Sequence, residues 1–117
     1  MKEPKYIYSK WIPFSGYKLM AFWRWIFIRK EYKGKLTPSD YTHEKIHLLQ
    51  QQEITVILFL LIYRLELLIK LICTFNYHKA YRSVSFEQEA YENQNRQSYL
   101  VSREKFAWRH FVFTLKK

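Results

Sequence analysis

Two histidines and a glutamate lie close together in the segment THEKIHLLQQQEI, residues 42–54. Because an α-helix turns about 100° per residue, His43 and His47 share one face, where both imidazoles can bind one metal ion. Glu44 follows His43 directly and can reach over that ion without being a ligand. The spacing matches HExxH, in which the carboxylate accepts a proton from a metal-activated water. The segment therefore predicts a Zn²⁺ site with Glu44 as general base.

The residues around this motif predict that it lies on a helix. Thr37 is suited to the N-cap, Pro38 is favoured at the first helical position, and Asp40 completes a capping box. No proline or glycine follows Pro38, so we expect the helix to continue unbroken into the apolar residues 54–75. An ordinary helix with two incidental histidines is the alternative to a metal site.

The apolar run after the motif could serve several purposes. Residues 54–63 carry no charge, but a bilayer span needs about 20 apolar residues. Extending the run to residue 75 adds Arg64, Glu66 and Lys70, each of which is costly in hydrocarbon. A buried core helix is therefore our first expectation, contact with the membrane interface the second, and a true span the third.

Length and composition limit the class of protein. The 117 residues allow one domain with a modest core, and 49% hydrophobic residues exclude a disordered chain. The single cysteine, Cys73, excludes an internal disulfide and a cysteine-rich zinc site, and its apolar neighbours predict a buried thiol. Residues 1–18 lack the pattern of a signal peptide, so we expect a cytoplasmic protein.

The net charge of +10 implies a positive surface. Basic and aromatic residues alternate in residues 18–35 and again in residues 103–117, a composition typical of membrane interfaces. An anionic membrane surface is therefore an expected partner, with the protein peripheral to the inner face of the membrane. The same mixture can stack on single-stranded nucleic acid, but no nucleic-acid motif with a defined spacing is present. We therefore do not expect a nucleic-acid partner.

The remaining segments are assigned from local patterns. The stretch WRWIFIRKEY is rich in aromatic and β-branched residues and favours a strand, and residues 5–32 are compatible with a hairpin. Residues 76–85 indicate a connection. Ser85 and Gln88 then predict a capping box that opens a polar helix at Phe86.

A catalytic zinc ion needs a third protein ligand beside the two histidines. Glu53 is a poor candidate, because without a glycine at position 50 the helix continues and Glu53 points away from His47. Glu87 and Glu89 open the following helix, which can pack back against the motif helix. Either carboxylate can then complete the site.

HEKIH at residues 43–47 and FEQEAY at residues 86–91 together resemble the motif pair of the gluzincin metallopeptidases, including the single-domain minigluzincins. In that family the second motif is E-x-E-A-(D/N), and its first glutamate binds zinc. The resemblance implies that His43, His47 and Glu87 are the metal ligands, with Glu89 as the alternative third ligand. It also implies a zinc-dependent peptidase that hydrolyses a peptide or protein substrate.

Tyr91 departs from the family pattern, because an Asp or Asn at this position usually orients a ligand histidine. Another side chain must then supply that acceptor, and the candidates are Gln51, Asn93 and Asn95. Tyr91, Tyr99 and His110 are the candidates for the donor that stabilises the substrate oxyanion, and the sequence does not choose among them. An extended substrate could pair with the strand expected around residues 22–29.

The resemblance covers mainly residues 37–95 and implies an α+β, mainly α, zincin-like domain over residues 1–117. Its expected parts are a β-rich N-terminal part (1–36), an active-site and apolar helical part (37–75), a third-ligand helix (85–102) and a basic aromatic tail (103–117). The alternative function is a membrane-peripheral or partner-binding protein with a structural, latent or inactive zinc site.

Overall fold

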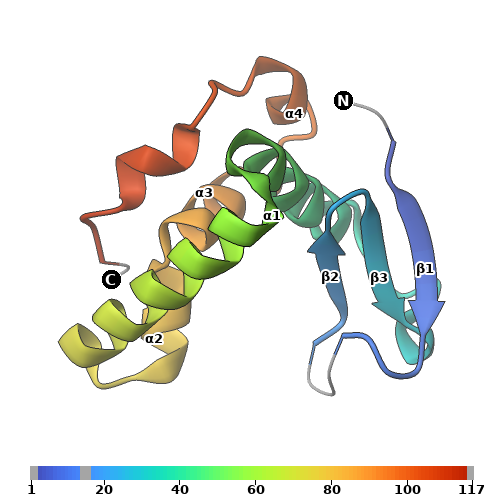
Figure 1. The fold of residues 1–117 in the computed structure, drawn as a ribbon. Helices are drawn as coiled ribbons and strands as arrows, with labels where there is room; N and C mark the ends of the chain where they lie inside the picture. The colour runs from blue at the N-terminus through green and yellow to red at the C-terminus, as the bar shows by residue number, and fades with distance from the viewer. Residues whose placement is uncertain (1–2, 14–16, 116–117) are drawn as a thin grey trace.

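Three short strands, β1 (Lys5–Ser9), β2 (Leu19–Phe22) and β3 (Trp25–Arg29), form a sheet in the order β1-β3-β2. Strands β2 and β3 are antiparallel, whereas β1 runs parallel to β3. The computed structural model describes residues 3–13 and 17–115, and Figure 1 shows the sheet at one side of a group of helices. The expected α+β fold class is confirmed.

The central strand β3 packs one face against the first helix. Ile26 and Ile28 alternate along β3 and are fully buried, and they pack in one cluster with the buried Ala21 of β2 and Leu48 of the helix. Because β3 has a neighbour on each side, its backbone cannot pair with a further strand. The prediction that residues 22–29 receive a substrate strand is therefore wrong for β3, and only β2 offers an edge within that range.

Helix α1 (Pro38–Thr74) begins as its capping box predicts. The Thr37 side chain accepts from the Asp40 backbone N–H, and the Asp40 side chain accepts from the Thr37 N–H at 2.9 Å. The expectation of an unbroken helix is wrong at Thr55, where φ is 73° and the helix kinks. The Thr55 hydroxyl then accepts from the Leu58 N–H and caps the second segment.

The kink divides α1 into a first segment, which packs on the sheet and on α3 (Ser85–Asn93), and a second segment, which packs on α2 (Tyr77–Ser83) and also on α3 (Figure 1). Residues 76–85 were expected to form a connection, but helix α2 occupies most of them because Asn76 accepts from the Lys79 N–H as its N-cap. Three short elements complete the chain: η1 (Lys30–Tyr32), α4 (Tyr99–Ser102) and η2 (Ala107–Phe111).

A second buried cluster lies between the second segment of α1, helix α3 and η2, and it contains Phe59, Val84 and Phe86. Two charged residues of the apolar run also point into this region. Glu66 accepts from the Ser85 backbone N–H at 2.9 Å, and Lys70 donates to Glu66 and to the Phe111 carbonyl, both at 3.3 Å. These charges are paired inside the protein, which accounts for their place in an apolar helix.

Replacing Thr37 with alanine removes one half of the capping box of α1. We expect the free energy of unfolding, measured by urea denaturation, to fall by about 1 kcal/mol, because the Asp40 N–H loses its side-chain acceptor. Thr37→Ser keeps a hydroxyl and should retain most of the stability. Equal stability of Thr37→Ala and the wild type would show that the cap does not stabilise the helix.

Candidate metal centre

Helices α1 and α3 bring two imidazoles and one carboxylate to a common point. His43 and His47 lie one turn apart on the first segment of α1, and Glu87 lies in the first turn of α3. The His43 and His47 Nε2 atoms lie 3.0 and 3.2 Å from Glu87 Oε1, and 3.2 Å from each other. All three side chains are buried, so the group forms a small enclosed centre.

The distances in this centre fit a metal ion. A tetrahedral zinc ion with bonds of about 2.0–2.1 Å holds its ligand atoms roughly 3.3 Å apart. The three distances among His43 Nε2, His47 Nε2 and Glu87 Oε1 are all within a few tenths of an ångström of this value. Potential ligand atoms of His43, Glu44 and His47 also lie within 4.8 Å of one another, so the Glu44 carboxylate is close to the position that the ion would take.

The other ring nitrogens show which atoms are free to bind a metal. His47 Nδ1 lies 2.7 Å from Gln50 Oε1, and His43 Nδ1 lies 2.8 Å from Gln94 Oε1. The Gln50 amide is fixed in this orientation because its Nε2 donates to the Phe86 carbonyl and to Glu89 Oε1. Since an amide oxygen can only accept, both Nδ1 atoms carry a proton, and the Nε2 atoms are the ones directed at the centre.

Two Nε2 atoms and a carboxylate oxygen therefore face one another at close range. Burial by itself lowers the pKa of His47, but the Glu87 carboxylate outweighs this effect and raises the pKa to about 9. Burial by itself raises the pKa of Glu87, but His47 and His43 outweigh it and hold the pKa well below its usual range. The centre thus favours positive charge, which a metal cation supplies when it replaces the proton.

Glu44 lies beside the centre and outside the three converging atoms. Its Oε1 accepts from the Ala21 backbone N–H at 3.0 Å, and its Oε2 lies 3.8 Å from His43 Nε2. Burial raises the pKa of the Glu44 carboxyl above its ordinary value. Sheet and helix thus hold this carboxylate with one oxygen directed at the centre, the arrangement that a general base requires.

The second segment of α1 supports the centre from another side. The Tyr63 hydroxyl donates to Glu87 Oε2 at 2.7 Å, which leaves Glu87 Oε1 directed at the histidines. The kink at Thr55 allows Tyr63 to reach α3 although His47 belongs to the same helix. Sequence reasoning missed Gln50, Gln94 and Tyr63 as supporting residues.

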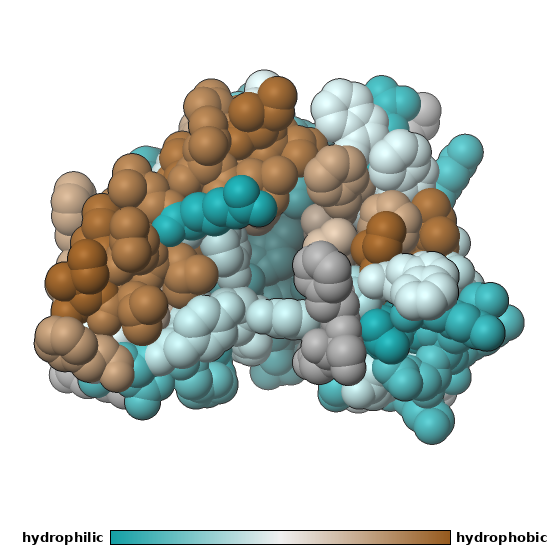
Figure 2. Space-filling view, turned by 60° about the horizontal axis from the view of Figure 1, so that its bottom comes forward, coloured by the Kyte–Doolittle hydropathy of each residue, from teal (hydrophilic) through white to brown (hydrophobic). Residues whose placement is uncertain are grey.

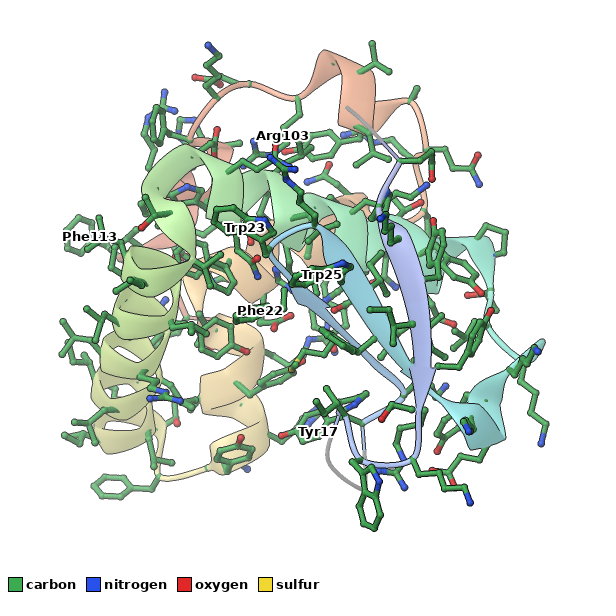
Figure 3. All side chains as sticks on the ribbon, turned by 45° about the vertical axis from the view of Figure 1, so that its right-hand side comes forward. Tyr17, Phe22, Trp23, Trp25, Arg103 and Phe113 are labelled. Atoms are coloured by element: carbon green, nitrogen blue, oxygen red, sulfur yellow. The ribbon has the colours of Figure 1, made fainter. Side chains whose placement is uncertain are left out.

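Several predicted site residues are placed elsewhere. Glu89, the alternative third ligand, is turned away from the histidines and binds Gln50, Tyr99 and Arg103. Arg103 also pairs with Glu53 at 2.9 Å, and Figure 3 shows Arg103 reaching from the C-terminal part of the chain toward α1. The buried ion pairs of Arg103 therefore hold the C-terminal part against both helices of the centre.

None of the acceptors expected for the ligand histidines contacts them. Gln51 bonds the backbone of Ala21 and Trp23, and Asn93 donates to the Glu89 carbonyl. Asn95 accepts from the Ser39 hydroxyl. The acceptors seen in the structure are Gln50 and Gln94 instead.

Of the three candidate oxyanion donors, Tyr91 contacts the centre, and the other two are held by other residues. The Tyr91 ring packs edge-on against His43 with centroids 4.5 Å apart. His110 is exposed and lies 3.6 Å from Glu104, and Tyr99 donates to Glu89. Of the tyrosines near Glu87, Tyr63 and Tyr81 line the adjoining cleft.

A cleft of about 320 Å³ opens next to the centre, and Glu44, His47 and Glu87 form part of its wall. Strand β2 lines one side, and the second segment of α1 and helix α2 line the other; Figure 2 shows the hollow between them. Tyr17 and Phe22 project from the sheet side toward these helices (Figure 3). The walls are mostly apolar and aromatic, with the polar groups gathered at the centre.

The chain matches no protein-family model, no curated protein and no solved structure. Its function must therefore be inferred from the site itself.

Replacing Gln94 with alanine should weaken zinc binding by about 10- to 100-fold, because the His43 ring loses the acceptor that orients it. Zinc affinity can be measured by competition with a chromophoric chelator. Gln52→Ala is the matched control, since Gln52 is exposed on α1 and makes no contact with the centre. An unchanged affinity in Gln94→Ala would show that this contact does not position the ligand.

Proposed function

We propose that this protein is a zinc-dependent peptidase that hydrolyses peptide bonds in the cleft beside His43, Glu44 and His47. The observation that carries the proposal is the convergence of His43 Nε2, His47 Nε2 and Glu87 Oε1, with the Glu44 carboxylate adjacent to them. Two histidines and one glutamate are a ligand set of catalytic zinc sites, which keep a further position open. The resemblance of residues 37–95 to the gluzincin motifs supports the same reaction.

Each residue of the centre has a role in this reaction. His43, His47 and Glu87 would hold Zn²⁺, which lowers the pKa of water to about 7 and polarises a carbonyl. Glu44 accepts the proton of the attacking water at Oε2, because its Oε1 is already bonded to Ala21. Glu44 then donates that proton to the leaving amine, so it serves as base and acid in turn.

Burial suits the Glu44 carboxyl to both proton transfers, from the water and to the leaving amine. Its raised pKa brings proton uptake nearer to neutral pH than an exposed carboxylate allows. The bond from the Ala21 N–H fixes the carboxylate without neutralising it. A residue held in this way can exchange a proton repeatedly without moving.

The cleft suits an extended peptide with apolar side chains. Strand β2 is an edge of the sheet, and side chains of Leu19, Met20 and Phe22 line the cleft. At Ala21 the backbone is already bonded to Glu44 and Gln51, so a substrate strand must pair elsewhere on this edge. Tyr81, which lines the cleft and interacts with Glu87, is the proposed donor to the substrate carbonyl oxygen.

Zinc binding is tested by metal analysis of the purified protein after zinc loading and dialysis. We expect one zinc per chain in the wild type and a loss of most bound zinc in His47→Ala, because one converging nitrogen is removed. His78→Ala is the matched control, since His78 is exposed on α2. Equal zinc content in His47→Ala and the wild type would contradict the ligand assignment.

Catalysis is tested by replacing Glu44 with glutamine in the zinc-loaded protein. With a fluorogenic peptide library as substrate, the rate should fall at least 100-fold, since the general base and acid is lost. Zinc content should not change, because Glu44 is not one of the converging ligands. Glu92→Gln, an exposed change on α3, should leave the rate as it is. Hydrolysis by Glu44→Gln at the wild-type rate would refute the mechanism.

A further inference from the structure

The second segment of α1 exposes a continuous apolar face. Apart from the neighbours Ile57 and Leu58, its members recur at intervals of three or four residues. All are between 49% and 72% exposed: Ile57, Leu58, Leu61, Leu65, Leu68 and Ile72. At 1.5 Å per residue this apolar face is about 22 Å long. Figure 2 shows it as the hydrophobic side of the molecule, next to the hollow of the cleft.

The apolar face is not the side of this segment that packs in the core. The opposite side of the same segment is already packed, with Val56, Phe59, Glu66 and Lys70 buried against the rest of the protein. Cys73, expected to be buried, is exposed because it lies at the end of the outward side. An outward row of large aliphatic side chains of this length indicates a binding surface.

The charges around the apolar face have one sign. Within residues 54–86 the only acidic residue is Glu66, which is buried and bonded to Ser85 and Lys70. Arg64 and Lys79 are exposed in the same region. The exposed formal charges of the apolar face and its border are therefore positive, which favours an anionic partner.

The same bias extends to the whole surface that the structure describes. Four of the ten acidic side chains are buried, namely Glu44, Glu66, Glu87 and Glu89. Among the basic side chains with a described burial, those of Lys70 and Arg103 are buried. The outer surface is therefore more strongly positive than the net charge of +10 suggests.

A second copy of the chain fits the apolar face less well than a lipid surface does. Pairing two copies face to face would enclose Arg64 of each copy, and residues 54–86 offer no exposed carboxylate to pair with it. An unpaired charge in such an interface is costly. Lipid phosphates, in contrast, can pair with Arg64 and Lys79 while acyl chains cover the leucines.

We propose that the second segment of α1 lies flat on an anionic lipid bilayer, with its apolar face in the interface. Among the described residues no helix has the length and apolar character needed to cross a membrane, so the contact is peripheral. Phe75 and Tyr77, both exposed where the segment ends, are suited to the headgroup level. Leu60 belongs to both this outward side and the cleft wall, so the cleft adjoins the bound surface.

The test is sedimentation of the full chain with vesicles of phosphatidylglycerol and phosphatidylcholine, and with vesicles of phosphatidylcholine alone. We expect binding to the anionic vesicles at low salt, with a lower affinity at high salt. The triple variant Leu61→Gln, Leu65→Gln, Leu68→Gln should lose at least about tenfold in affinity, because it removes three aliphatic side chains that the bilayer would cover.

Val101→Gln is the matched control, since Val101 is 92% exposed on α4, outside the apolar face. It should bind as the wild type does. Zinc content and circular dichroism of the triple variant should match the wild type, which separates loss of docking from loss of folding or of the metal centre.

Three results would overturn the proposal. The wild type could fail to bind anionic vesicles at low salt. The triple variant could bind with unchanged affinity, in which case the basic residues elsewhere carry the interaction. Sedimentation equilibrium without lipid could show a wild-type dimer that the triple variant abolishes, in which case a second copy covers the apolar face.

Discussion

The structure depends on the packing of α3 against the first segment of α1, which forces one Glu87 oxygen and two imidazole nitrogens into mutual contact. Because His43 Nδ1 and His47 Nδ1 donate to amide oxygens, the Nε2 atoms of both rings are the ones directed at Glu87 Oε1. Glu87 raises the pKa of His47, so a proton on His47 Nε2 attracts Glu87 when no metal is bound, and a metal cation takes the place of that proton. The metal-binding property of the centre thus follows from hydrogen bonds outside it as much as from the HExxH spacing.

The surrounding polar groups form a chain of contacts that fixes this arrangement. Gln50 connects His47 to Glu89, and Arg103 connects Glu89 to Glu53 and so to the C-terminal part. Buried carboxylates require partners, so Glu89 and Glu53 hold the C-terminal part in place. The same residues that stabilise the fold therefore set the orientation of the ligand imidazole.

The sequence was informative where structure is local and less so where it depends on tertiary packing. The capping box at Thr37 and the shared face of the histidines follow from helix geometry, and Gln50, three residues after His47, could have been found by the same periodicity. The capping box predicted at Ser85 and Gln88 is wrong, because α3 begins at Ser85 itself and the Ser85 hydroxyl bonds to Glu66. Which of Glu87 and Glu89 faces the histidines depends on how α3 packs, so local patterns left it open. The kink at Thr55 had no local signal, because threonine has no preference for positive φ. A prediction from sequence that lacks this kink cannot place the Tyr63 hydroxyl next to Glu87.

Zinc K-edge X-ray absorption of the zinc-loaded protein tests the central claim most directly, because it reports the atoms bound to the metal. The account predicts a four-coordinate ion with two imidazole ligands, oxygen in the remaining positions and no sulfur. A six-coordinate spectrum without imidazole scattering, or a spectrum with a sulfur ligand, would contradict the assignment of His43, His47 and Glu87.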